Sequence, residues 1–290
     1  MTSAAVEITG FRPDTATADD IAQITSHIYT NKIVVLRDQR LNPSEFAALG
    51  ALFGTPVPYY EPMYQHPDEP LVFVSSNRAS ESGSGRRIGV PKTGAFWHAD
   101  YQFMPKPFAI TAFYPQLLPS AGRGTYFIDM AQAYARLDDR LRAAVEHTRC
   151  RHSVRRYVKI RPDDVYRPLG AVIDEVERRT PPQTFPTVLT HPVTRKRQLY
   201  LSEAFTYAMM DEAGDDLGDL LVEVLAETGQ LDPDCTHPNI FLQTYEPGDI
   251  VLWDNRTLIH RALHNPNDEP SESFRVTLAD EYPLGLEVAP

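Results

Sequence analysis

Cysteine is nearly absent from this sequence, which contains only Cys150 and Cys235 in 290 residues. Two thiols cannot form a disulfide framework or a cysteine-rich zinc site, so we expect both to be reduced, as in a cytoplasmic protein. Long apolar runs are lacking as well: the longest, such as 70–74 and 249–253, fall far short of the roughly 20 residues of a membrane span. The N-terminal segment lacks the basic and apolar regions of a signal peptide. The sequence thus predicts no membrane partner and a cytoplasmic location.

Positive charge is also in short supply. Lys and Arg total 28 against 39 Asp and Glu, which gives a formal net charge of −11. This acidic balance argues against a nucleic-acid groove or an anionic membrane surface as partner. It is compatible with a small anionic substrate in a local basic pocket. Because the chain is long and 42% hydrophobic, it can bury a large core without a structural metal or disulfide.

Proline, in contrast, is plentiful, with 25 residues placed between short apolar runs. This pattern indicates a turn-rich chain of short strands with a few inserted helices. No segment has the composition of a linker, so we expect one domain covering residues 1–290. Many short strands with peripheral helices favour a mainly β fold of the sandwich or jelly-roll type. The expected helices cover 19–30, 43–53, 132–147 and 216–228, and the expected strands cover 32–38, 72–75, 95–103, 108–114, 125–129, 187–190, 198–201, 240–245, 250–254, 258–261 and 274–280.

The segment Phe96-Trp97-His98-Ala99-Asp100 carries the first candidate metal ligands. On a strand, alternate side chains face the same way, so we expect His98 and Asp100 to point together. An imidazole and a carboxylate at this spacing can occupy adjacent positions on one metal ion. By itself, the pattern is more often a polar edge strand with a solvated Asp100.

The segment 246–260, with the sequence EPGDIVLWDNRTLIH, can supply a third ligand. Pro247-Gly248 predicts a tight turn, of type II, between two strands. His260 ends the segment. Two histidines and one carboxylate on one face form the facial triad of non-heme Fe(II) oxygenases, which leaves metal positions open. Taken alone, His260 would be a hydrogen-bonded core histidine.

The last candidate of this kind is Arg275, on the final expected strand. A guanidinium can grip a carboxylate through two parallel hydrogen bonds. An arginine behind a metal is what the far carboxylate of a dicarboxylic co-substrate needs. Taken alone, an arginine on a strand is usually a surface charge.

The sequence resembles the taurine dioxygenase-like (TauD/TfdA) family of Fe(II)/2-oxoglutarate oxygenases in the order of these motifs: His98-x-Asp100, Gly124-Thr125 after a glycine-rich turn, WDNR-x3-His260, and Arg275. The resemblance runs from about Ile33 to Thr277, and WDNR-x3-His is its most specific piece. It implies a mainly β fold with flanking helices, a double-stranded β-helix (jelly roll), and an enzyme that uses Fe(II), 2-oxoglutarate and O2. It places the iron ligands at His98, Asp100 and His260, and the residues that hold the far carboxylate of 2-oxoglutarate at Thr125 and Arg275.

One position departs from part of that family. Members that use sulfonates carry a second arginine four residues after the co-substrate arginine, and Ala279 stands there in this chain. The departure puts a sulfonate substrate in doubt.

A narrower resemblance is to the isonitrile-forming branch of the family, found in actinobacterial isonitrile lipopeptide pathways. It implies an oxidative decarboxylase that converts the N–CH2–COOH group of a (3R)-3-[(carboxymethyl)amino] fatty acid into an isonitrile, with loss of CO2. The strings that carry it are VPYYEPMYQH at 57–66, VPKTGAFWHADYQFMPKPFA at 90–109, RGTYFID at 123–129, KIRPDDVYRPLG at 159–170 and HRALH at 260–264.

That substrate has two carboxylates, which makes basic and hydroxyl side chains candidate anchors. Lys159 lies in a basic run, and with the resemblance we expect it to hold a carboxylate; without it, a solvated basic edge is the better interpretation. His264 can donate to a carboxylate beside the iron or be a loop histidine. Tyr59, Tyr60 and Tyr64 can donate hydroxyls while their rings exclude water, or pack in the core, and we favour Tyr59 and Tyr64 for the pocket. Gly94 permits close backbone approach of a substrate.

Two other functions stay open at this point. A second enzyme of the same family, a hydroxylase of another small amino acid or carboxylate, would share the iron site and differ in product. A cupin-type protein that binds metal or ligand without turnover is the alternative from another class, although it would not need the carboxylate clamp of Thr125 and Arg275. A homo-oligomer is possible, and the acyl chain length is left open.

Overall fold

The computed structural model describes residues 5–78, 93–155, 164–264 and 269–282. No helix in these ranges is long and apolar enough to cross a membrane. The single domain expected from the sequence stays a prediction. By its contacts the chain divides into two compact units, the first made of Met1–Ala95, Phe108–Phe127 and Phe241–Tyr282, and the second of Phe96–Pro107, Ile128–Ile240 and Pro283–Pro290.

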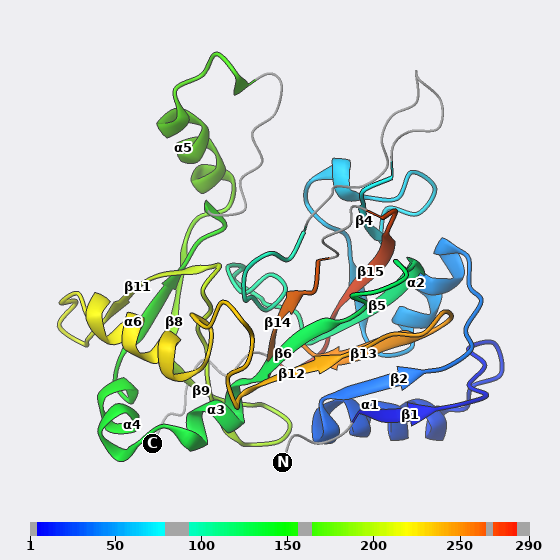
Figure 1. The fold of residues 1–290 in the computed structure, drawn as a ribbon, viewed down its shortest axis with the longest axis horizontal. Coiled ribbons are helices and arrows are strands. Elements are labelled where there is room, and N and C mark those ends of the chain that lie inside the picture. The colour runs from blue at the N-terminus through cyan, green and yellow to red at the C-terminus, as the bar shows by residue number, and fades with distance from the viewer. Residues whose placement is uncertain (1–4, 79–92, 156–163, 265–268, 283–290) are drawn as a thin grey trace. The chain divides into compact units, whose positions relative to one another are not determined.

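The first unit is built on a seven-stranded sheet with the order β1-β2-β13-β5-β15-β3, in which β4 also pairs with β15 (Figure 1). β1 and β2 run parallel, and β13, β5 and β15 pair antiparallel with their neighbours. The strands are β1 (Val6–Ile8), β2 (Ile33–Leu36), β3 (Thr55–Val57), β4 (Phe73–Ser76), β5 (Ile110–Leu117), β13 (Ile250–Asp254) and β15 (Glu272–Ala279).

A smaller sheet, of order β12-β6-β14, packs against one face of the large sheet. Its strands are β12 (Ile240–Gln243), β6 (Thr125–Asp129) and β14 (Leu258–Ala262). Strand alternation decides which residues meet between the sheets. Val251 and Trp253 point inward and contact the cluster that contains Phe127 and Leu258. This interior is where the inward residues of β6, β14 and β15 lie.

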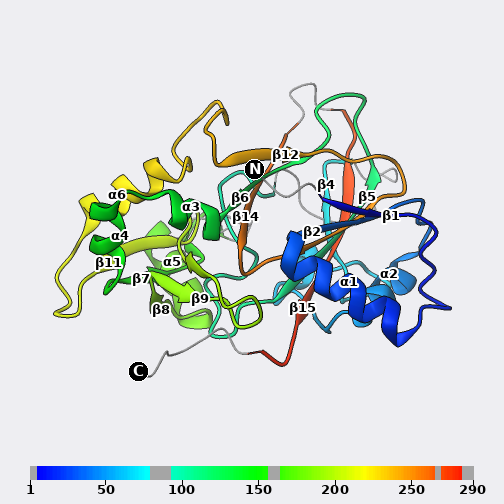
Figure 2. The same cartoon turned by 90° about the horizontal axis from the view of Figure 1, so that it is seen from below.

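Helices cover the other face of the large sheet, as Figure 2 shows for α1 (Ala18–Asn31) and α2 (Pro43–Ala51). Each begins where the sequence provides a cap. The Thr17 and Asn42 side chains accept the N–H of the third helical residue, and that residue's carboxylate accepts the N–H of the cap in return. Leu252 and its neighbours on this face pack against the helices.

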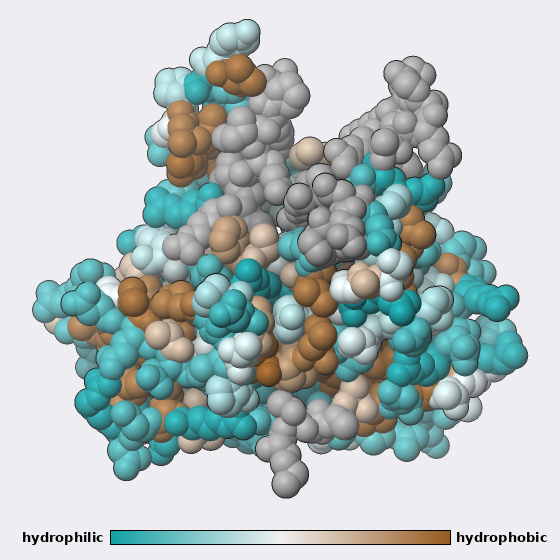
Figure 3. Space-filling model, viewed as in Figure 1, coloured by the Kyte–Doolittle hydropathy of each residue, from teal (hydrophilic) through white to brown (hydrophobic). Residues whose placement is uncertain are grey.

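The second unit combines short helices with two small sheets, of orders β11-β7-β8 and β10-β9. Figure 3 shows hydrophobic residues around α5. Leu169, the first residue of this helix, is exposed, as is Val165 shortly before it. The elements are α3 (Met130–Arg136), α4 (Asp139–Val145), β7 (Arg149–His152), α5 (Leu169–Arg179), β8 (Gln183–Pro186), β9 (Val188–Thr190), β10 (Arg197–Leu199), β11 (Thr206–Met210) and α6 (Gly218–Glu227), and the first unit adds the 3-10 helix η1 (Pro62–Tyr64).

Two expectations for the second unit are wrong. The helix expected at 132–147 is two helices, because Leu137 adopts an extended ψ of 142° and the Asp138 side chain then caps α4. The strand expected at 95–103 does not form. From Asp100 onward that segment is a succession of turns, with the Gln102 N–H on the Ala99 carbonyl (3.3 Å).

Candidate metal centre

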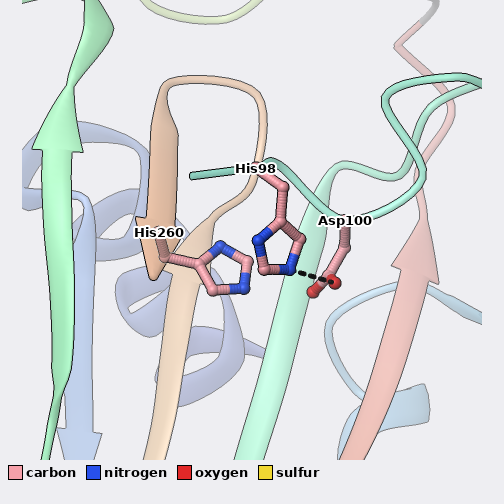
Figure 4. Close-up of side chains that lie close together, drawn as sticks. All are labelled: His98, Asp100 and His260. Atoms are coloured by element: carbon pink, nitrogen blue, oxygen red, sulfur yellow. Dashed lines mark ion pairs between the residues drawn. The ribbon is translucent and has the colours of Figure 1, made fainter. Parts of the chain in front are cut away.

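Three buried side chains that were predicted as ligands lie together (Figure 4). His98, Asp100 and His260 each offer one ligand atom, and these atoms all lie within 4.8 Å of one another. His98 Nε2 is 3.8 Å from Asp100 Oδ1. Two imidazoles and a carboxylate so close together are spaced as ligands of a single ion.

His98 is oriented by its own backbone rather than by a strand ladder. Its Nδ1 lies 2.8 Å from the Phe96 carbonyl, and because a carbonyl can only accept, Nδ1 carries the proton. In the neutral imidazole Nε2 is then the unprotonated nitrogen, which is the form that ligates a metal. The Phe205 ring packs edge-on against the imidazole, with centroids 5.9 Å apart. The Ala204 N–H donates to the Trp97 carbonyl at 3.0 Å, which holds the backbone beside His98.

His260 points into the interior between the two sheets of the first unit. It alternates with Ile259 on β14, so it shares the inward face with Leu258. Its ring meets Trp253 edge-on at 4.9 Å and lies 5.9 Å from Phe127. These apolar walls exclude water and strengthen electrostatic interactions at the imidazole.

The turn that leads into β14 explains the WDNR motif. Asp254 Oδ1 accepts the N–H of Arg256 at 3.0 Å, and Asp254 Oδ2 accepts the Thr257 hydroxyl at 2.6 Å. Asn255 donates its side-chain amide to the Phe108 carbonyl at 3.2 Å. The motif therefore fixes the hairpin that carries His260, and within it Trp253 packs on that ring.

The donor set fits iron. Two neutral imidazoles and a carboxylate suit a borderline divalent ion, whose charge the carboxylate offsets in part. With three protein ligands, a bound iron ion would keep positions for a chelating co-substrate and for O2. Among the described residues, no other group of three His, Cys, Asp or Glu side chains meets the same spacing.

Thr125, predicted to hold 2-oxoglutarate, is buried on β6 in the same interior. Its hydroxyl accepts a short hydrogen bond from Tyr245. Burial raises the pKa of Tyr245, so the phenol stays protonated as the donor. The residue before it must be glycine, since a Cβ on Gly124 would lie 2.7 Å from the Gln243 carbonyl oxygen.

Arg275, the second predicted co-substrate residue, is half-buried on the inward face of β15. In the strand register it stands between Phe113 on β5 and Phe73 on β4. The guanidinium carbon lies 4.2 Å from the centroid of the Phe73 ring. The ring centroid of Phe113 lies 5.3 Å from that of Tyr245, which donates to Thr125. Phe113 and Tyr245 therefore link Arg275 to Thr125 through side-chain contacts.

The predicted substrate residues fall in several places. Tyr59 contacts Tyr60 and Tyr64 ring to ring, at 4.6 and 4.8 Å, with Tyr60 exposed and Tyr64 buried. Gly94 has a positive φ of 73° and its carbonyl accepts the Ala262 N–H at 2.9 Å. His264 is exposed just after β14. Lys159 lies outside the described residues.

Three residues of this neighbourhood were not foreseen: Tyr245, Phe113 and Phe73. Phe113 and Phe73 face Arg275 through the register of β5 and β4 on β15, which sequence patterns do not give. Tyr245 reaches Thr125 by a side-chain hydrogen bond from the segment that follows β12. The sequence offers one hint for these residues: strand alternation places Phe113 on the face of its strand that points to the interior, as it does for Val251.

A cluster of two histidines and one carboxylate is the ligand set of the non-heme iron oxygenases. The chain belongs to the taurine catabolism dioxygenase TauD, TfdA family, whose model matches residues 2–277. It is therefore an Fe(II)/2-oxoglutarate-dependent dioxygenase that acts on small molecules, with Fe(II), 2-oxoglutarate and O2 as cofactors.

Individual relatives agree with this assignment. Pentalenolactone F synthase from Streptomyces arenae is 30% identical over 248 residues, which cover 83% of this chain and 80% of that protein. An (S)-phenoxypropionate/alpha-ketoglutarate-dioxygenase from Sphingobium herbicidovorans is 32% identical over 190 residues, or 63% of this chain and 61% of that protein. The solved structure of a taurine dioxygenase from Burkholderia xenovorans has a TM-score of 0.71 at 22% identity and covers 98% of this chain and 91% of that one. The expected mainly β jelly roll is confirmed.

Proposed function

We propose that this dioxygenase is an oxidative decarboxylase that converts an N-carboxymethyl-3-amino fatty acid into a 3-isocyano fatty acid. The observation that carries the proposal is the resemblance at 57–66, 90–109, 123–129, 159–170 and 260–264. Two of these strings, 57–66 and 159–170, contain no expected iron ligand or 2-oxoglutarate residue, so their resemblance supports the substrate assignment independently of the shared iron chemistry.

In this proposal His98, Asp100 and His260 hold Fe(II). Arg275 grips the far carboxylate of 2-oxoglutarate with its guanidinium, and Thr125 donates its hydroxyl proton to the same carboxylate. Iron with 2-oxoglutarate and O2 supplies the oxidising power for C–H chemistry. The protein positions the N–CH2 carbon and excludes water, which the apolar walls of Trp253 and Phe127 favour.

The substrate carboxylates need donors of their own. Lys159, His264 and the hydroxyls of Tyr59, Tyr60 and Tyr64 are the candidates, with the Gly94 backbone bordering the substrate. A lysine ammonium suits a carboxylate that is held as a point charge.

The proposed reaction fixes a stoichiometry. R–NH–CH2–COOH loses four hydrogens and four electrons on becoming R–N≡C and CO2. Each 2-oxoglutarate, with one O2, accounts for two electrons and yields succinate and CO2. One product therefore consumes two 2-oxoglutarate and two O2, and releases two succinate, two water and three CO2 in all.

The test is anaerobic reconstitution with Fe(II) and 2-oxoglutarate, followed by O2 and 3-[(carboxymethyl)amino]butanoic acid, with products identified by mass spectrometry. We expect the isonitrile, with two succinates for each product. His260→Gln, which removes one proposed iron ligand, is the control and should give neither compound. Succinate without any change in the test acid would reject this substrate class, and no succinate at all would return the cupin-type binding protein to consideration.

A hydroxylase of another small carboxylate is the second candidate, because one relative is a phenoxypropionate dioxygenase at 32% identity. A ratio near one succinate for each product, with a hydroxylated acid in place of the isonitrile, would favour it over the decarboxylase.

A further inference from the structure

We propose that Phe73 is a positioning residue that sets the Arg275 guanidinium in place for the far carboxylate of 2-oxoglutarate. The inference rests on the proposed role of Arg275. It adds a third residue to the clamp of Thr125 and Arg275, and this residue acts on the co-substrate only through Arg275.

The contact between the two side chains is direct. Phe73 is the register partner of Arg275 across β4 and β15, so both side chains stand on the same sheet face. The guanidinium carbon lies 4.2 Å from the ring centroid, well inside the range of a cation–π interaction. An aromatic face attracts the cation without taking an N–H as an acceptor would, which leaves donors for a carboxylate.

Phe73 is itself held in place. It is 9% exposed, Tyr64 lies nearly parallel to it with centroids 5.0 Å apart, and Tyr59 meets it edge-on at 5.2 Å. The backbone of β4 is paired with β15 from Phe73 to Ser76. A ring fixed on this many sides gives the guanidinium a fixed surface.

This arrangement matters because arginine side chains are long and carry high rotamer entropy. A side chain already laid on a rigid ring loses less freedom when it binds its ligand, so affinity rises through pre-organisation. The tyrosine cluster at 59–64, which the sequence suggested as a substrate surface, then also supports the co-substrate clamp through Phe73.

The test is titration of the Mn(II)-loaded protein with 2-oxoglutarate by calorimetry, with no oxygen chemistry required. Phe73→Leu keeps an apolar side chain and removes the π face, and we expect roughly 3- to 30-fold weaker binding. Phe73→Tyr, which keeps the π face, should stay within about twofold of the native affinity by the same reasoning.

The matched control is Phe274→Leu, on the same strand as Arg275. Phe274 is 6% exposed on the opposite face of the sheet and packs in the helix-side core. Phe274→Leu should lower the melting temperature about as much as Phe73→Leu does, and it should leave 2-oxoglutarate binding unchanged. Phe73→Leu should also bind 2-oxobutyrate as the native protein does, because that 2-oxo acid lacks the far carboxylate.

Two results would overturn the inference. One is native 2-oxoglutarate affinity in Phe73→Leu, and the other is equal loss of 2-oxoglutarate and 2-oxobutyrate, which would mean general distortion of the site. Arg275→Gln separates the two proposals. Native affinity in that variant rejects the clamp itself, whereas weak binding there with native binding in Phe73→Leu rejects only the positioning role.

Discussion

At the scale of single residues, Tyr245 decides what the Thr125 hydroxyl can do. Tyr245 donates to Thr125 Oγ1, and its raised pKa keeps it a donor at any working pH. A hydroxyl that accepts one hydrogen bond still has its own proton to give. The tyrosine thus turns Thr125 into a donor toward the interior, which is the role the proposed clamp needs.

Tyr245→Phe should therefore raise the KM for 2-oxoglutarate and leave kcat nearly unchanged. The lost orienting hydrogen bond is worth about 1–1.5 kcal/mol, or roughly 5- to 15-fold in KM. Steady-state kinetics with 2-oxoglutarate varied at saturating substrate measures it. Tyr114→Phe is the control, since Tyr114 donates to the Gln39 carbonyl at 3.0 Å, on the helix side of the sheet. Equal KM values in Tyr245→Phe and the native enzyme would contradict the assignment.

At the scale of elements, what the sequence predicted was what local chemistry decides. The expected helices at 19–30 and 43–53 form as α1 and α2, because capping side chains, apolar spacing and a first-turn proline act within a few residues. The turn at Pro247-Gly248 also forms, with Gly248 at φ 88° and the Asp249 N–H on the Glu246 carbonyl. The turn of the WDNR hairpin is also decided locally, because Asp254 bonds to residues two and three positions later.

What the sequence could not give depends on distant partners. The alternation at 95–103 suggested a strand, yet the structure holds this segment through Ala204 and through turns, with Tyr101 at a positive φ of 60°. His98 and Asp100 lie close together there without strand geometry, so their expected proximity is confirmed while the strand reasoning for it is wrong. The Phe73–Arg275 contact needed the register of β4 on β15, which no local pattern encodes.

The end of β15 is tied to the WDNR hairpin by a buried ion pair. Arg256 donates to both oxygens of Asp280, at 2.7 and 2.5 Å, and the Tyr29 hydroxyl donates to Asp280 at 2.7 Å. The two charged side chains are 3% and 10% exposed. A charge left alone in such a place is costly.

We expect Asp280→Ala to lower the free energy of unfolding by about 3–5 kcal/mol, because Arg256 stays buried without its carboxylate. Denaturant unfolding at pH 7 measures the change. Glu223→Ala removes the partner of Arg140 in an exposed ion pair and should change stability little. A change in Asp280→Ala as small as that in Glu223→Ala would show that the stability of the fold does not depend on the buried ion pair.

At the scale of the whole molecule, we expect the pH dependence of stability to involve His152, which is not one of the three candidate metal ligands. His152 on β7 is fully buried, and its Nδ1 lies 3.1 Å from the Thr206 hydroxyl. Among the described residues its Nε2 has no hydrogen-bond partner. Burial lowers the pKa of His152 to about 3, so the folded protein keeps it neutral.

The sign of the pH effect follows from where the proton binds. Below pH 6.5 the unfolded chain protonates His152 and the folded protein does not, so protons favour unfolding. The stability that His152 contributes is complete above pH 6.5 and is lost as the pH falls toward 3. Between pH 7 and pH 5 the loss from this one residue amounts to about 2 kcal/mol.

His152→Gln should remove that part of the pH dependence, because glutamine keeps a polar side chain near Thr206 and does not titrate. The measurement is the free energy of unfolding at pH 7 and pH 5 for both proteins, so that all other titrating groups cancel in the comparison. His147→Gln, at an exposed position, should leave the native dependence intact. A native dependence in His152→Gln would mean that His152 becomes protonated before the chain unfolds, through local opening around β7 rather than with the loss of the whole fold.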